Sequence, residues 1–400
     1  MMKRQAFPTL QRRSALVLMG QVFMAALGVA GLSSFAFAQT STPTPEQLAD
    51  YQRKLADYNA AQQKFTEDVK AYWDLVSAQR AVRNGKRRNG EQVALNDYVL
   101  TQPPVYQGPP QPMNPAAPPV TPPPVSVTYI PVKADFLKNA AAKFNFVPRV
   151  PVNEAEFKKA YARAANAAAV LKDQAVRIYG FEAGGNGTYD VQAGLEYNVP
   201  GARAISTALG YNQLLNTNSV ELLAEEGDQF VKALEARATT LTGSDQAALN
   251  KKIETLKSMI EFSKSVPDEW SEHVKLGNEP EGLGIHALNL DVDVGPLLQT
   301  QKLLNSIKFA KSKGRLAPLT AAELEMMNLT GDGNGFDMIS APLEWRSQIP
   351  TSNFFQRSGY DDNSVVRRNN VISTLLAATD AKMDSESKLP GAKDLGAAFP

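Results

Sequence analysis

The chain contains no cysteine and only two histidines, and its 42 basic and 41 acidic residues leave a formal charge of +1. The absence of cysteine excludes disulfide frameworks, thiolate metal sites and cysteine nucleophiles. Two histidines leave little room for a histidine-rich metal site or a histidine-dependent catalytic triad. Because the charge is balanced, a general nucleic-acid-binding surface is not indicated, and we expect no nucleic-acid partner.

The overall composition is that of an ordinary globular protein. Hydrophobic residues make up 43% and charged residues 21% of 400 positions. This balance excludes a multi-span membrane protein and a fully disordered chain.

The N-terminus predicts a secretory signal. Four basic residues precede or flank the start of an apolar stretch from Ala15 to Phe35, which ends in Ala36-Phe37-Ala38. Small residues in this arrangement are the pattern that signal peptidase cuts. We therefore predict a signal peptide over 1–38, export to the periplasm or outside the cell, and no stable membrane insertion after cleavage. A retained anchor is the alternative, and Arg12-Arg13 leaves both the general and the twin-arginine export routes open.

A long helix is predicted from Thr44 to about Asn84. Thr44 and Gln47 form a capping box, and Pro45 occupies the first helical position. A heptad seam follows, and a single helix cannot bury such a seam by itself. We interpret 39–100 as a coiled-coil-type segment that packs on itself through residues 45–84, on a partner or on the rest of the chain. The seam consists of Leu48, Tyr51, Leu55, Tyr58, Gln62, Phe65, Val69, Tyr72 and Val76.

Basic and proline-rich segments follow this helix. Arg80, Arg83, Lys86, Arg87 and Arg88 form a basic patch, which we interpret as a solvated helix end. Contact with an anionic cell-wall polymer or membrane headgroups is the alternative interpretation of this patch. Between Pro103 and Pro131 twelve residues are proline. We predict a polyproline-type linker over 101–131.

The remainder, 132–400, has a globular composition and predicts a mainly α fold with at most a small β-sheet. Asn153 with Glu156 marks the start of a helix over 153–181. The Gly-rich stretch 184–194 and the segment 204–209 are the candidates for short strands. Further helices are predicted over 218–240, 244–265, 296–313, 320–328 and 364–383.

Glu182 continues the apolar seam of the predicted helix over 153–181. Gly184-Gly185 follow and end the helix, so the carboxyl lies at its C-terminal end. Burial and the negative pole of the helix dipole both raise the pKa of a carboxyl group. A carboxylic acid that stays protonated near neutral pH suits general-acid cleavage of a glycosidic bond. A glutamate that turns outward at a frayed helix end is the alternative.

Downstream of Glu182, the segment from Ala208 to Thr217 carries a second pattern, Ala-Leu-Gly-Tyr-Asn-Gln-Leu-Leu-Asn-Thr. With Glu182 as the acid, the chain resembles the lysozyme-like lytic transglycosylases of the bacterial cell wall. Gln213 matches the glutamine of that family's cleft-lining motif, and Asn328 with the glycines at 331 and 333 resembles its third motif. Ala183 stands where the family has serine, and a helical insertion is predicted over about 218–313.

The resemblance implies the fold and the substrate: a lysozyme-like domain over 132–400 that cuts peptidoglycan between N-acetylmuramic acid and N-acetylglucosamine. Glu182 would act first as acid and then as base on the muramyl 6-hydroxyl, which gives a 1,6-anhydro product without a metal or cofactor. Gln213 and Asn328 would bind sugar groups in a cleft. The candidate sugar-stacking residues, which core packing explains equally well, are Tyr189, Tyr211 and Tyr360.

Other interpretations stay open at this point. Asp190 and Glu196 are near Glu182 in sequence, so hydrolysis with a second carboxylate is an alternative to the lyase reaction. A non-catalytic wall-binding or scaffold protein with a degenerate lysozyme-like domain is the alternative function. His273 and His286 are interpreted as structural, Asp332 and Asn334 as part of a plain turn rather than a calcium loop, and Asp291 and Asp293 as solvated.

Overall fold

The computed structural model describes residues 43–117, 129–195 and 199–400. Over these ranges the predicted mainly α fold is confirmed, and the only β-structure is a set of isolated bridges such as that between Gln192 and Leu209. The predicted signal peptide over 1–38 lies outside the described residues. No helix of the described ranges combines the length and the apolar character needed to span a membrane.

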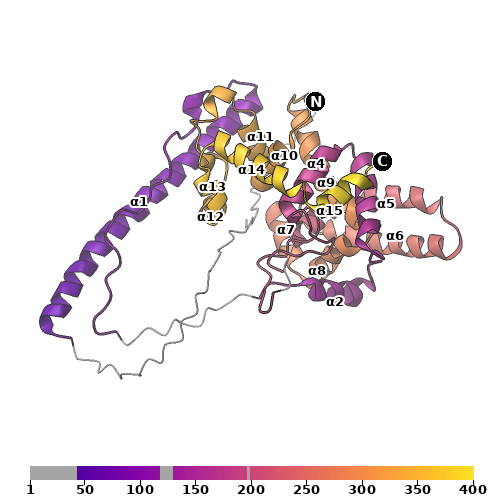
Figure 1. The fold of residues 1–400 in the computed structure, drawn as a ribbon, viewed down its shortest axis with the longest axis horizontal. Coiled ribbons are helices and arrows are strands. Elements are labelled where there is room, and N and C mark those ends of the chain that lie inside the picture. Colours follow the sequence, from indigo (N-terminus) through magenta and orange to yellow (C-terminus); the bar gives the residue numbers. More distant parts are fainter. Residues whose placement is uncertain (1–42, 118–128, 196–198) are drawn as a thin grey trace.

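Most of the helical elements follow one another closely along the chain, but long connecting segments separate η1 from α2 and α4 from α5 (Figure 1). The first is α1 (Pro45–Asn89), followed by the short 3₁₀ helix η1 (Leu95–Asp97). The middle of the chain forms α2 (Lys133–Phe144), α3 (Glu154–Ala167), α4 (Lys172–Ala183), α5 (Asn216–Ala238), α6 (Gly243–Ser263), α7 (Trp270–Gly277), α8 (Pro280–His286), η2 (Ala287–Leu290) and α9 (Gly295–Ser312). The C-terminal part forms α10 (Ala321–Thr330), α11 (Asp332–Ile339), η3 (Leu343–Trp345), η4 (Thr351–Asn353), α12 (Arg357–Asp361), α13 (Ser364–Arg368), α14 (Ile372–Glu386) and α15 (Pro390–Ala398).

Two apolar clusters organise the helices. One is built mainly from α3, α4, α10, α11, α14, α15 and the C-terminal half of α1. The other is built mainly from α2, α5, α6, α7 and α8. Helix α9 joins them, because Leu303 belongs to the first cluster and Leu298 to the second. The second cluster extends beyond the predicted insertion at 218–313, since it includes α2.

Helix α1 begins as predicted but does not form a separate segment. Thr44 accepts a hydrogen bond from the Gln47 backbone, and Pro45 starts the helix. In the C-terminal half, Tyr72 and Val76 are buried in the first apolar cluster. Of the three alternatives for the predicted 39–100 segment, packing on the rest of the chain therefore holds for this half of α1.

Most of the basic patch on α1 forms an internal network of ion pairs and hydrogen bonds, so the prediction of a solvated helix end is wrong except at the exposed Arg88. The side chain of Arg83 is fully buried, and its Nε donates to Asp337 on α11 over 2.8 Å. Arg87 and Tyr98 also donate to Asp337. Arg80 Nη2 donates to the carbonyl of Phe355 over 2.8 Å. These contacts fix the end of α1 to the C-terminal part of the chain.

Part of the proline-rich segment returns along α1. The Tyr106 ring packs edge-on against Phe65 and Tyr58, with ring centroids 5.4 and 6.3 Å apart. The lengths agree: eight polyproline-type residues from Tyr98 to Tyr106 span about 25 Å, and α1 from Arg83 back to Phe65 spans about 27 Å. The start of the predicted linker thus covers part of the heptad seam, and the seam packs on the rest of the chain there.

The predicted helix over 153–181 is two helices. Asn153 caps α3 as expected, by accepting a hydrogen bond from the Glu156 backbone. The chain then breaks at Ala169, which has a left-handed φ of 54°, before α4 starts. Because the run is rich in alanine, it predicts a continuous apolar seam through Leu171. Leu171 is in fact 50% exposed. The helix predicted over 364–383 is likewise divided, into α13 and α14.

We predict that Asp337→Asn destabilises the protein by about 3–5 kcal/mol, because it leaves the buried Arg83 guanidinium without a counter-charge. Urea unfolding at neutral pH measures this loss. As a control, Lys64→Gln removes an exposed pair with Asp68 and should change the stability by less than about 1 kcal/mol. Equal effects of the two substitutions would contradict the role given to Asp337.

Candidate active site at a buried carboxyl pair

Glu182 lies in the last turn of α4, on the same face as the buried residues Ala175 and Ile178. Gly184 adopts a left-handed φ of 63° and ends the helix, as the sequence predicts. Gly185 is also left-handed, and a side chain there would collide with the carbonyl of Glu386. The two glycines therefore let the chain turn sharply against the end of α14, which keeps the end of α4 close to that helix.

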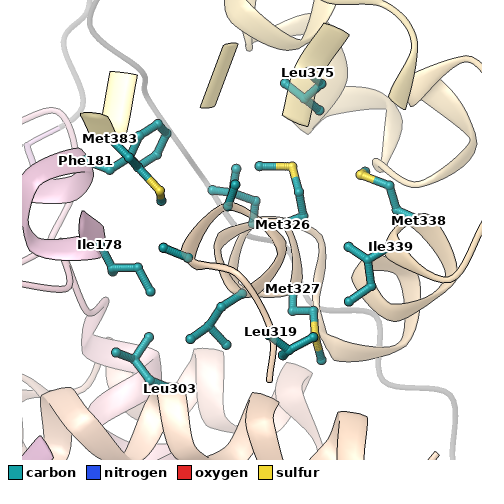
Figure 2. Packing of buried hydrophobic residues seen from close by; sticks show 14 of the residues in the cluster. Ile178, Phe181, Leu303, Leu319, Met326, Met327, Met338, Ile339, Leu375 and Met383 are labelled. Carbon is teal, nitrogen blue, oxygen red and sulfur yellow. The ribbon is translucent and has the colours of Figure 1, made fainter. Parts of the chain in front are cut away.

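Helix α10 lies opposite Glu182 and is buried on almost all sides. Of its ten residues, Asn328 alone is not buried. The Asn328 Nδ2 donates to Glu182 Oε1 over 3.0 Å. Apolar side chains from α4, α9, α11 and α14 surround α10 (Figure 2). Asn328 and Glu182 are both half-buried, so their contact lies at the edge of this packing.

Glu325 precedes Asn328 by three residues, so both project from one face of α10. The Glu325 side chain is fully buried, and neither carboxyl oxygen accepts a well-formed hydrogen bond from an N–H or O–H group in the described ranges. The Glu182 carboxyl lies within hydrogen-bonding reach of it. An ionised carboxylate can only accept hydrogen bonds, so the pair is satisfied when one carboxyl keeps its proton and donates it to the other.

The surroundings of the pair favour that proton. Burial raises the pKa of Glu182 to about 7, while contacts with Glu325, Lys382 and Asn328 partly oppose the rise. Burial and the neighbouring Glu182 charge raise the pKa of Glu325 well above its ordinary range. Two adjacent carboxyls in an apolar site cannot both ionise at low cost. Because Glu182 is only half-buried, it is the member of the pair that can exchange a proton with a substrate.

Lys382 on α14 supplies the local positive charge. Its Nζ lies 4.7 Å from the centroid of the Phe181 ring, and its charge lowers the pKa of both Glu182 and Glu325. When Glu182 gives up its proton, Glu325 keeps its own, and the pair then carries a single negative charge that Lys382 balances. Glu182 can therefore act as a weak acid near neutral pH.

The other predicted site residues do not gather around Glu182. The Gln213 side chain donates to the carbonyls of Val191 and Gly210, over 3.1 and 2.8 Å, and so stabilises its own turn, where Gln213 has a φ of 45°. Tyr211 is fully buried and donates to Glu154. A buried ring of this kind cannot stack on a sugar. The expected cleft with Gln213 opposite Glu182 is therefore absent among the described contacts.

Tyr189 and Tyr360 also have structural contacts. Tyr189 is half-buried and packs against Phe157, with ring centroids 5.2 Å apart. Tyr360 is 5% exposed and packs edge-on against Trp73 of α1. Asn328 is thus the one predicted binding residue that the structure brings to Glu182.

The weaker candidates resolve into structural groups. His286 is fully buried between the hydroxyl of Ser219 and the carbonyl of Thr207. Asp332 starts α11 and accepts a hydrogen bond from Ser306. Asp291 and Asp293 are buried ion-pair partners of Lys252, so the prediction that they are solvated is wrong.

Asp190 does not supply a second catalytic group at Glu182. Asp190 forms an ion pair with Lys133 over 2.6 Å, and this bond helps to lower its pKa although burial opposes it. Glu196 lies outside the described residues. Within the described ranges, no group of three or more His, Asp or Glu side chains is arranged to hold a metal ion.

Comparison with protein-family models, curated proteins and solved structures found no match. The chemistry of the site is therefore argued from its own residues. Glu325 and Lys382 were missed by the sequence analysis. The available signal for Glu325 was a second glutamate inside the apolar run from Ala321 to Met327, one helical turn before Asn328.

We predict that the carboxyl pair makes the protein less stable as the pH rises. Folding raises the pKa of Glu182 from 4.5 to about 7, so its contribution is full below pH 4.5 and is lost as the pH rises through 7. Glu325→Gln removes one of the two acids, and it should reduce the loss of unfolding free energy between pH 5 and pH 8 by about 2 kcal/mol.

Urea unfolding at the two pH values measures this difference. Glu261→Gln, which changes an exposed glutamate on α6, should leave the wild-type pH dependence intact. Parallel pH profiles for the wild type and Glu325→Gln would show that the two carboxyls do not interact.

Proposed function

We propose that this protein cleaves a glycosidic bond with Glu182 as a single general acid, and that its substrate is the glycan strand of peptidoglycan. The observation that carries the proposal is the half-buried Glu182 carboxyl, whose pKa is about 7 and which faces the buried Glu325. Such a group holds a proton near neutral pH and can give it to a leaving oxygen.

The proposed reaction needs one accessible carboxyl. Glu182 protonates the glycosidic oxygen as the bond to the anomeric carbon breaks. It then takes the proton of the muramyl 6-hydroxyl, whose oxygen attacks that carbon and closes a 1,6-anhydro ring. Asn328, which donates to Glu182 Oε1, holds the carboxyl in place through the cycle.

The geometry of the pair favours this scheme over two-carboxylate hydrolysis. Retaining and inverting glycosidases place their carboxyls about 5–5.5 or 6.5–9.5 Å apart, on opposite sides of the sugar. Glu325 is instead within hydrogen-bonding reach of Glu182 and fully buried. It cannot reach a sugar or activate a water molecule, so its role is to hold the proton on the pair.

The choice of peptidoglycan depends on the resemblance of Glu182, Asn328 and the segment 208–217 to the lytic transglycosylases, and on the signal-like N-terminus. Export through residues 1–38 would bring the protein to the cell wall. The contact between Glu182 and Asn328 supports the resemblance, because these two residues came from separate motifs 146 positions apart.

A second candidate is a non-catalytic wall-binding or scaffold protein. The observation that favours it is the position of the Gln213 and Tyr211 side chains, which bind their own turn and core and leave no sugar-binding row beside Glu182. Binding to sacculi without release of fragments would support this candidate.

We predict that Glu182→Gln reduces the release of muropeptides from purified sacculi at least about 100-fold, because glutamine cannot donate the proton. Mass spectrometry of the products measures this, and the anhydro product is lighter than the hydrolytic one by one water. Wild-type activity should fall above pH 7, as Glu182 loses its proton.

Glu261→Gln serves as the matched control and should keep full activity, since this exposed glutamate lies on α6. The absence of any released product from the wild type, or equal release by Glu182→Gln, would refute the assignment of Glu182.

A further inference from the structure

A separate pocket lies beside the second apolar cluster and is lined by the end of α5, the first half of α6 and the loop that follows α2. Its volume is about 700 Å³, which is within the range of small-molecule sites. It does not include Glu182 or its neighbours, so it is independent of the proposed glycan-cleaving site.

Asp293 organises the cationic wall of this pocket. Its side chain is 5% exposed and pairs with three cations. Oδ1 accepts from Arg149 over 2.8 Å and from Arg237 over 2.5 Å, while Oδ2 accepts from Arg149 over 3.3 Å and from Lys252 over 2.5 Å. The carboxylate is fully used, and these cations hold its pKa well below the ordinary range although burial opposes them.

The wall keeps donors that this network does not use. Among the described contacts, Arg237 gives one hydrogen bond, to Asp293. Its side chain is 43% exposed, so the other N–H groups of its guanidinium are accessible to a ligand. Lys251 lines the pocket, is exposed and forms no ion pair within the described ranges. The lining holds four basic side chains and the two acids Asp245 and Asp293, while Glu156 and Asp291 pair with Arg149 and Lys252 from outside it. The donors left for a ligand are therefore those of Arg237 and Lys251.

An apolar floor lies beside these donors. Phe146 and Leu249 line the pocket and are 5% and 4% exposed, and Leu241 is half-buried. A guanidinium binds a carboxylate with paired, charge-assisted hydrogen bonds. Asp245 opposes a second negative charge on the ligand, because its own carboxylate lines the same pocket.

We propose that this pocket binds a small organic monocarboxylate with an apolar body. Arg237 and Lys251 hold the carboxylate, and the apolar body packs against Phe146 and Leu249. Asp293 is a positioning residue, since it aligns Arg237 and Arg149 and has no free oxygen for the ligand.

The test uses N-acetyl-L-leucine as the probe and its uncharged amide as the matched ligand, titrated against the full chain by saturation-transfer NMR. For a ligand of this size we expect a dissociation constant on the order of 1 mM. The amide should bind at least about tenfold more weakly, because it lacks the charge-assisted hydrogen bonds.

Arg237→Gln should weaken N-acetyl-L-leucine at least about tenfold, and Lys251→Gln should weaken it severalfold. Lys251 is exposed and unpaired, so this second variant keeps the fold and remains informative if Arg237→Gln unfolds. Lys257→Gln, on α6 but outside the pocket lining, should bind like the wild type.

Three results would overturn the proposal. The first is no binding of N-acetyl-L-leucine to the wild type, and the second is equal binding of the amide. The third is unchanged affinity for N-acetyl-L-leucine in both Lys251→Gln and a folded Arg237→Gln. Binding of inorganic phosphate without binding of N-acetyl-L-leucine would also overturn it, because the apolar floor would then have no part.

Discussion

Two carboxyl groups that touch in an apolar interior cannot both lose their protons, and this constraint governs the Glu182–Glu325 pair. Glu325 is fully buried beside Glu182, with Asn328 as a further hydrogen-bonding neighbour, so it keeps its proton to a pH at which isolated glutamates are ionised. Glu182 is half-buried, so its carboxyl can exchange a proton with a group at the surface. An acid that works near neutral pH follows from burial alone, without a metal or a histidine.

The fold provides this burial by surrounding one small helix. Helix α10 is covered by α4, α9, α11 and α14 (Figure 2). Helix α11 is in turn tied to α1 through the buried pair of Asp337 and Arg83. The long N-terminal helix is therefore part of the same packed body as the acid. The pocket at Asp293 differs from this site, because three cations there surround a carboxylate and keep it ionised.

Local sequence signals predicted several helix boundaries correctly. The cap at Thr44, the cap at Asn153 and the Gly184-Gly185 ending place helix boundaries correctly, since each depends on neighbouring residues only. Long-range partners were not accessible: the Arg83–Asp337 pair joins residues 254 positions apart, and the basic run looked solvated. Glu325 was missed because the apolar run around it predicts that the helix is buried, but does not show that Glu325 faces Glu182. The break at Ala169 was hidden by alanines that suit a continuous helix.

The most direct measurement is the pKa of Glu182 itself, from a ¹³C-carboxyl NMR titration of labelled protein with assignment by Glu182→Gln. We expect a value of about 7 in the wild type, and a value that stays raised in Glu325→Gln, because burial raises the pKa of Glu182 while the contact with Glu325 lowers it. A wild-type value near 4.5, or a fall to the ordinary glutamate range in Glu325→Gln, would contradict the claim that burial keeps Glu182 protonated near neutral pH.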